Sequence, residues 1–198
     1  PPAPPSVPHP PRSDAYQFVF TSVRGPVQAL ISLAEMRLYD DAGEQVGVAE
    51  ALNPGGVPGN HLETPQSAID GITDNKWLDA NFSGEAVLQL VLSEPRHVAQ
   101  YELFTARGRH RARDPTGWRF GILRRGVGGA GEDDFEVLSV VSGVEPPNNE
   151  SSSYGRFFAV QPPPMPPQLP PPLPPMPPRL PPAPPSVPHP PRSDAYQF

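Results

Sequence analysis

The sequence contains no cysteine and a single lysine, Lys76, among its 198 residues. The absence of cysteine excludes a disulfide framework, a cysteine-ligated zinc site and a thiol nucleophile, although it does not exclude an extracellular location. No apolar run approaches the roughly 18 residues of a membrane-spanning helix, so no membrane span is expected. The formal charge of −6 argues against broad nucleic-acid binding.

Proline, by contrast, is abundant: the chain has 34 prolines, whereas about 5% is usual for globular proteins. Seven of them lie in residues 1–12 and 19 in residues 162–192, which leaves eight for the segment between. The middle segment has the length of one globular domain and can bury a core. The flanks cannot, and because proline fixes φ they are predicted to be polyproline II rods.

The two ends of the sequence repeat each other. Residues 1–18 and residues 181–198 both read PPAPPSVPHPPRSDAYQF, so the chain is one 180-residue period followed by the start of the next. Such a period predicts a longer tandem array of a globular module and a Pro-rich rod. The expected order is a rod over 1–12, a module over 13–161, a second rod over 162–192 and the start of the next module over 193–198.

The module shows β-rich or alternating runs and almost no helical periodicity. Turn clusters such as residues 40–43 and 53–56 separate these runs. Seven or so short strands in about 150 residues predict an all-β fold, an antiparallel jelly-roll β-sandwich flanked by extended polyproline II segments. The expected strands are residues 16–23, 30–39, 87–92, 98–105, 118–123, 135–141 and 156–160.

Three segments carry a resemblance to a known family: LAEMRLY at 33–39, AIDG at 68–71 with Trp77, and RDPTGW at 113–118. Over most of residues 18–160 the module resembles the discoidin, or coagulation-factor type C, modules of the galactose-binding-like superfamily. In that family the LAE-containing strand usually closes the fold, whereas here it precedes AIDG, so the resemblance implies a circularly permuted member. It also implies that Trp77 and Trp118 pack inside the module.

The resemblance further implies a structural calcium ion between the AIDG loop and the LAE strand, held by oxygen ligands. Asn75 and Ile72 depart from the residues usual in relatives, which weakens the implied ligand set by one side chain. The residues alone allow an alternative, in which Asp70 caps the turn before Gly71 and Glu35 pairs with an arginine. The implied side-chain ligands are Glu35, Asp70 and Asn75, and the implied carbonyl ligands belong to Ala34, Ser67 and Ile72.

A basic loop, RGRHRAR at 107–113, stands out on this acidic chain. Arg107, Arg109, His110 and Arg111 are the predicted ligand-binding residues, because guanidinium groups bind carboxylates and sulfates bidentately, as in uronic or sulfated sugars. Two alternatives stay open. The loop is solvated, with Arg113 bonded to carboxylates such as Asp114, or it contacts the acidic run 132–134 of a neighbouring module.

The Pro-rich run from residue 162 resembles the hydroxyproline-rich glycoproteins of plant and green-algal walls, which implies hydroxylated prolines bearing short sugar chains. The alternative is an inert spacer. Asn81 and Asn149 open two N-glycosylation sequons. The implied O-glycosylation positions are Ser6, Ser186, Pro163, Pro164, Pro167, Pro171, Pro172, Pro175, Pro178, Pro182 and Pro185.

No spacing of residues singles out a catalytic pair, so no enzyme is predicted. The glycines of 126–131 fit a dinucleotide fingerprint, but acidic residues and a strand follow them where a helix would be needed. The sequence predicts a structural subunit of an extracellular glycoprotein fibre or cell-surface appendage that assembles through neighbouring repeats or chains, with calcium as its cofactor. The alternative is a lectin-like wall or matrix protein whose repeated modules bind polysaccharide.

Overall fold

The computed structural model describes residues 11–26, 30–108, 110–124, 126 and 134–160. The contacts divide the chain into two units, Pro1–Pro163 and Pro164–Phe198, of which the second lies wholly outside the described residues. Several sequence predictions also lie outside them: the polyproline II segments apart from Pro11 and Arg12, the start of the next module, Arg109, the glycines of 127–131, the acidic residues 132 and 133, and the serines and prolines proposed to carry glycans.

The described residues form eleven strands and two short 3₁₀ helices, which confirms the prediction of an all-β fold. Every pairing between these strands is antiparallel. No helix among the described residues has the length and apolarity to cross a membrane. The elements are β1 (Ser13–Val23), β2 (Ile31–Leu33), β3 (Glu35–Tyr39), β4 (Gln45–Val46), β5 (Val48–Leu52), η1 (Pro65–Ala68), β6 (Trp77–Asp79), β7 (Ala86–Arg96), β8 (Gln100–Phe104), η2 (Arg111–Arg113), β9 (Pro115–Arg124), β10 (Asp134–Val141) and β11 (Ser153–Phe158).

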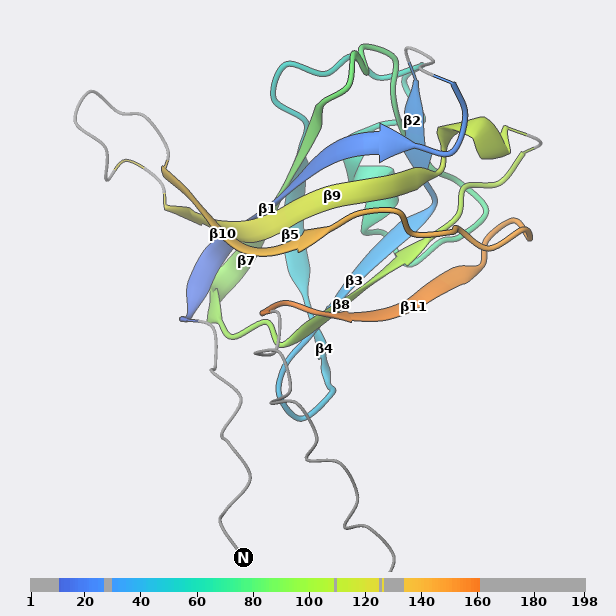
Figure 1. Cartoon of the computed structure of the whole chain (residues 1–198). Coiled ribbons are helices and arrows are strands. Elements are labelled where there is room, and N and C mark those ends of the chain that lie inside the picture. Colours follow the sequence, from blue (N-terminus) through green and yellow to red (C-terminus); the bar gives the residue numbers. More distant parts are fainter. Residues whose placement is uncertain (1–10, 27–29, 109, 125, 127–133, 161–198) are drawn as a thin grey trace, which may run out of the picture. The chain divides into compact units, whose positions relative to one another are not determined.

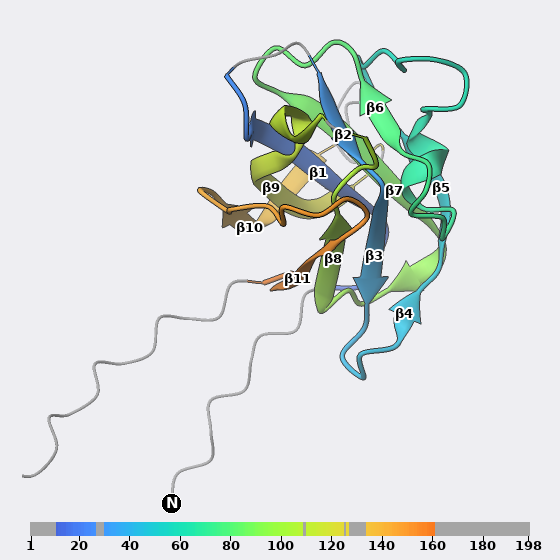
Figure 2. The ribbon, with the colours of Figure 1, turned by 90° about the vertical axis from the view of Figure 1, so that its right-hand side faces the viewer.

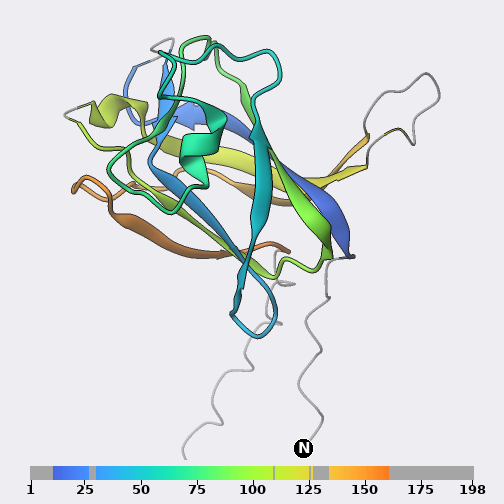
Figure 3. The ribbon, with the colours of Figure 1, turned by 180° about the vertical axis from the view of Figure 1, so that it is seen from behind.

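Two larger sheets pack against each other. One has the order β10-β9-β1-β7-β5 and the other β11-β8-β3-β4, while β2 and β6 form a separate pair (Figure 1). Aromatic rings pack between the two sheets. The centroid of the Phe18 ring on β1 lies 5.0 Å from that of the Tyr101 ring on β8, and the centroid of the Tyr101 ring lies 4.6 Å from that of the Phe120 ring on β9. Figure 2 looks onto the four-stranded sheet, and Figure 3 shows η1 beside β5 from behind.

The core follows from alternating apolar residues on central strands. In β7 the apolar side chains at every second position are buried, as a strand with one buried face requires. Trp77 and Trp118 are both fully buried, which confirms that they pack inside the module. The Trp118 Nε1–H group donates to the Tyr101 hydroxyl at 2.9 Å, so its polar atom is satisfied within the core.

The prediction of one strand over 30–39 is wrong. The run breaks at Ala34, whose N–H group donates to the Phe104 carbonyl at 3.0 Å. Before the break β2 pairs with β6, and after it β3 pairs with β8, so the two halves of the run belong to different sheets. The short strands β4, β5 and β6 were not predicted, because two to five residues do not establish a period.

The chain enters and leaves the module at the same end. Ser13, the first residue of β1, lies opposite Arg96 at the end of β7, and Phe158, the last residue of β11, lies opposite Gln100 at the start of β8. The Ala159 N–H group adds a hydrogen bond to the Ala99 carbonyl at 2.8 Å. The turn between β7 and β8 therefore holds both ends of the module (Figure 1).

Candidate functional site

The candidate site lies at the other end of the sandwich, where β3 begins and β8 finishes. Glu35 lies opposite Phe104 there, four residues along each strand from the pair formed by Tyr39 and Gln100. Two loops meet at this end: the Ser151 hydroxyl donates to the Thr73 carbonyl at 2.7 Å, joining the turn before β11 to the loop after η1. Ser151 has φ of 52°, a conformation that non-glycine residues rarely adopt and that surrounding contacts must hold.

Glu35 is a buried carboxylate, with 1% of its surface exposed. Both of its oxygens accept the Gly71 N–H group, at 3.3 and 3.2 Å. Burial raises the pKa of Glu35 to about 7, and neither the Gly71 hydrogen bond nor the positive charge of Arg37 offsets that cost. No ion pair among the described residues includes Glu35, so the alternative of an arginine partner is not found.

The side chains of Asp70 and Asn75 are hydrogen-bonded to each other beside Glu35. The Asn75 Nδ2 group donates to Asp70 Oδ2 at 2.5 Å, and Asp70 Oδ1 accepts the Ile72 N–H group at 2.9 Å. Asp70 therefore does cap this turn, as the alternative interpretation expected. The Asn75 Oδ1 atom is buried and has no hydrogen-bond partner among the described residues. A buried acceptor without a partner carries a free-energy cost that a bound cation would remove.

The residues implied by the calcium hypothesis are thus partly brought together. Ser67 and Ala34 are buried, and the Ser67 hydroxyl donates to the Leu62 carbonyl at 2.8 Å, whereas Ile72 is 53% exposed. The side chains of Glu35, Asp70 and Asn75 would all offer oxygen atoms as metal ligands, and a hard cation prefers oxygen ligands. Two carboxylates and an amide are fewer than a full shell, and no group of three or more His, Cys, Asp or Glu residues that would hold a metal occurs in the described part of the chain.

The described arginines of the basic loop, Arg107, Arg111 and Arg113, do not converge on one point. The Arg107 Nη1 atom lies 3.6 Å from the Asp74 Oδ1 atom. Arg111 belongs to η2, and the side chains of Arg111 and His110 are both exposed. Arg113 is half-buried and does not pair with Asp114. The partner of the Asp114 carboxylate is Arg24, at 3.5 Å.

Sequence reasoning missed Arg24, which ties three segments together. Its guanidinium group donates to the carbonyls of Pro146 and Pro147 and to the Asn148 side chain, while its backbone N–H group donates to the Asp114 carbonyl at 2.9 Å. Nothing in the residues around position 24 marks this contact, because its partners lie about 90 and 120 residues further along the chain. Arg24 therefore connects the end of β1 to the residue before β9 and to the loop after β10.

A hollow of about 330 Å³ opens beside the Asp70–Asn75 pair. Three loops line it, and of its residues only Arg107 and Asn75 were predicted as site residues. The Lys76 ammonium lies 3.0 Å from Glu63 Oε1 within it. No local motif could have revealed this group, since its members are brought together only by the fold. The lining residues are Asn60, Leu62, Glu63, Asp74, Asn75, Lys76, Arg107 and Gly108.

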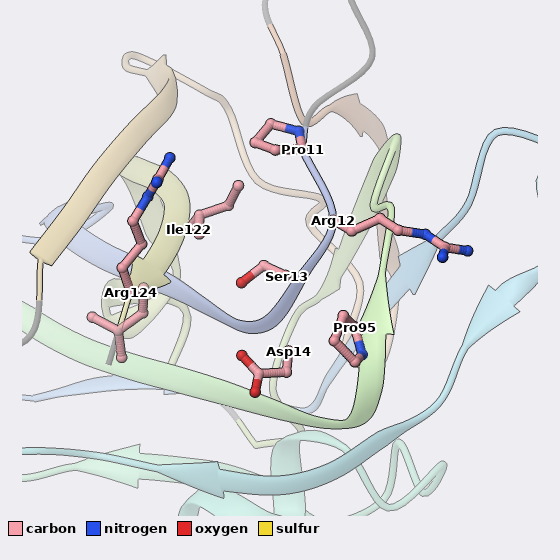
Figure 4. Close-up of a pocket in the computed structure, with 8 residues that line it drawn as sticks. Pro11, Arg12, Ser13, Asp14, Pro95, Ile122 and Arg124 are labelled. Atoms are coloured by element: carbon pink, nitrogen blue, oxygen red, sulfur yellow. The ribbon is translucent and has the colours of Figure 1, made fainter. Parts of the chain in front are cut away.

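A second hollow, of about 410 Å³, lies where the chain enters β1 (Figure 4). Pro11, Pro95 and Ile122 supply apolar lining, and the Arg12 side chain extends away from that of Arg124. The Ser13 hydroxyl is already engaged with the Ala15 carbonyl at 2.9 Å. This hollow therefore brings together no convergent set of polar groups.

Both predicted N-glycosylation sequons lie on the surface of the module. Asn81 and Asn149 are exposed. The Asn81 Nδ2 group donates to the Gly55 carbonyl at 3.1 Å, and the Asn149 backbone carbonyl accepts the Thr105 hydroxyl at 2.6 Å. A scan of protein-family models and searches of curated proteins and of solved structures found no match to this chain.

Proposed function

We propose that this chain is a section of a secreted structural glycoprotein, a tandem array of β-sandwich modules joined by polyproline II rods. The observation that carries the proposal is the identity of residues 1–18 with residues 181–198. Residues 13–18 form the first half of β1, a strand that lies between β9 and β7 in the middle of its sheet. The same letters at 193–198 would then begin the central strand of a second module.

The position of the module's ends supports this arrangement. Because Ser13 and Phe158 are both held at the β7–β8 turn, the chain that precedes the module and the chain that follows it attach at one end of the sandwich. The loops at the other end of the sandwich would then be the ones that contact other molecules. The array would assemble into an extracellular wall fibre or surface appendage through neighbouring repeats or chains.

The family assignments belong to the same proposal. We take the module as a circularly permuted discoidin-like jelly roll, supported by the burial of Trp77 and Trp118 at the positions of the family motifs. The Pro-rich segments would be hydroxylated and O-glycosylated, as in hydroxyproline-rich wall glycoproteins.

Calcium would act as a structural ion in this module. Glu35, Asp70 and Asn75 would hold it through side-chain oxygens, supported by the buried Asn75 Oδ1 atom that has no partner in the described structure. When bound, the ion supplies positive charge that pins the loop after η1 to the start of β3. Carbonyl oxygens of Ala34, Ser67 and Ile72 would complete the ligands that the resemblance implies.

Mass spectrometry of the native material tests the structural proposal. The intact mass of the native chain is expected to exceed that of one 180-residue period several-fold, and its Pro-rich peptides are expected to carry mass increments of hydroxyl and sugar groups on the prolines. Unmodified prolines would contradict the wall-glycoprotein assignment, and a native chain without further copies of the 180-residue period would contradict the array.

A second candidate function, a lectin-like protein, is favoured by one observation. The hollow lined by Asn60, Lys76 and Arg107 carries several hydrogen-bonding side chains at the end of the sandwich opposite to the chain's attachment points. Repetition of such a site along an array would raise the avidity for a polysaccharide without strengthening any single contact.

A further inference from the structure

We infer that the hollow lined by Glu63, Asp74, Lys76 and Arg107 takes a neutral saccharide rather than a uronic or sulfated sugar. This inference rests on the second candidate function and names its ligand class. It also departs from the expectation that the arginines of the basic loop bind anions.

The charges of the lining carry the inference. Each carboxylate in the hollow lies beside a cation: Glu63 is 3.0 Å from Lys76, and Asp74 is 3.6 Å from Arg107. The formal charges of these four side chains cancel. An anionic sugar would approach two carboxylates and would have to separate each cation from its present partner, whereas a neutral ligand carries no charge for the carboxylates to repel.

Hydroxyl groups match this lining better than charged groups do. A sugar hydroxyl both donates and accepts, so a vicinal diol donates to a carboxylate and accepts from the neighbouring cation without breaking the ion pair. The side chains of Glu63 and Lys76 are only 20% and 19% exposed, so this pair is held in place before a ligand arrives. Asn60 is fixed at the rim, because its Oδ1 atom accepts the Leu62 N–H group at 2.8 Å.

The hollow also offers an apolar contact and a suitable size. Leu62 is 67% exposed and lies in the lining, where its side chain can pack on the C–H groups of a sugar ring. A volume of about 330 Å³ is at the small end for ligand pockets, as one or two sugar rings require. Together the paired charges, the fixed amide and the exposed aliphatic side chain give a polar site with one apolar wall.

Two sources could present such a sugar to this hollow. One is a neutral polysaccharide outside the chain, and the other is the neutral glycan of a Pro-rich segment on a second copy of the chain. The chemistry that the hollow recognises is the same in both cases, so the ligand class can be tested first with free sugars.

The first test titrates the full 198-residue chain, followed by ¹H–¹⁵N correlation spectra, with D-galactose, L-arabinose, D-galacturonate and galactose 6-sulfate. The neutral sugars are expected to shift the amide resonances of Asn75, Lys76 and Gly108 with dissociation constants of about 1–10 mM. The two acidic sugars should bind at least about five times more weakly. Equal or tighter binding of an acidic sugar, or no shift with any sugar up to about 50 mM, overturns the inference.

A matched pair of variants gives the second test. Asp74→Asn leaves the hollow with one excess positive charge, so binding of the neutral sugar should fall about fivefold while galacturonate binding rises. The Asp74 side chain is 75% exposed, so the thermal midpoint should not change. Asp14→Asn makes the same charge change at an exposed residue by the other hollow (Figure 4). If the two variants bind both sugars alike, the inference is wrong.

The third test separates the sources. Pull-down by a neutral arabinogalactan assigns an external polysaccharide, and self-association of the native glycosylated chain that free galactose reverses assigns the glycans of a second copy. Failure of both contradicts the inference. None of these outcomes bears on the tandem array, which the mass spectrometry of the native chain tests by itself.

Discussion

Asp114 shows how burial can outweigh a nearby opposite charge. The residue is 3% exposed, and its carboxylate lies 3.5 Å from Arg24. Burial raises the pKa of Asp114 to about 6, even though Arg24 and Arg111 act in the opposite direction. The Arg24 Nη2 group also donates to the Pro146 and Pro147 carbonyls, so its N–H groups are not directed at the Asp114 carboxylate alone.

This shift predicts a pH dependence of stability. Between about pH 4 and pH 6 the folded chain keeps the Asp114 proton while the unfolded chain loses it, so the free energy of unfolding should fall as the pH rises. The contribution is at most about 3 kcal/mol, from about 1.4 kcal/mol per pKa unit. Urea unfolding of the wild type and of Asp114→Asn at pH 4, 5, 6 and 7 measures it.

The variant should show a flatter dependence than the wild type over that range. Asp134→Asn, a change at an exposed residue of β10, should keep the wild-type slope. Equal slopes for Asp114→Asn and the wild type would show that Asp114 ionises as easily in the folded chain as in the unfolded chain.

Trp118 should be among the residues on which the core depends most. It is fully buried, and its ring lies 5.1 Å from that of Phe157 on β11. Trp118→Ala should lower the free energy of unfolding by about 3–5 kcal/mol, because it leaves a cavity and removes the donor to the Tyr101 hydroxyl. Urea denaturation followed by circular dichroism measures the loss. Leu62→Ala, at a residue 67% exposed, should change stability by no more than about 0.5 kcal/mol.

At the scale of the element, close approach of β9 and β10 depends on a glycine. Gly121 on β9 lies opposite Val137, and a Cβ atom at position 121 would lie 2.0 Å from the Glu136 carbonyl oxygen. Because that oxygen belongs to the backbone of the neighbouring strand, the clash cannot be relieved by a side-chain rotation. Gly121 therefore sets the spacing of these two strands.

Gly121→Ala should destabilise the module by about 2 kcal/mol or more, since the backbone of β10 must move. Gly47→Ala is the matched control, because no atom lies within 4 Å of an added Cβ there and the residue is exposed. The control should be neutral or stabilising by up to about 1 kcal/mol. Thermal unfolding of the two variants compares them, and equal midpoints would contradict the assignment of Gly121.

Strands β2 and β3 show where the sequence was insufficient to predict an element. Ile31, Leu33 and Leu38 are apolar residues of one uninterrupted run, and periodicity alone joins them into a single strand. The break comes from tertiary contacts: Ile31 lies opposite Asp79 and Leu38 opposite Tyr101, in two different sheets. Likewise, β6 exists as a strand because β2 is beside it, and no local signal announces that pairing.

At the scale of the whole molecule, calcium should stabilise the module. After treatment with a chelator, calcium at about 100 times its dissociation constant should add about 2.7 kcal/mol to the free energy of unfolding. That gain corresponds to a rise in the thermal midpoint of about 5–10 °C for a module of this size. Asp70→Asn should abolish the rise, whereas Glu94→Gln, on a side chain 66% exposed, should keep it. An unchanged midpoint for the wild type would remove calcium from the proposal.

The Pro-rich segments should add little to the stability of the module, because the strands and core residues that the structure describes, from Ser13 to Ala159, already form the two packed sheets. A chain limited to these residues should melt within about 3 °C of the full chain. Ending the chain at residue 152 instead should unfold it, since Phe157 on β11 packs on Tyr101 and Trp118. A stable fold without β11 would show that this edge strand is dispensable.

The sequence by itself determined the β-rich composition of the module, the concentration of proline outside it and the 180-residue period. These properties follow from local patterns: residue alternation, the fixed φ of proline and repetition of letters. Only the tertiary structure decided that both ends of the module meet at one turn and that Glu63 and Lys76 share a hollow with Asp74 and Arg107. Those groups lie up to about 45 residues apart, and only the packing of the sheets brings them together.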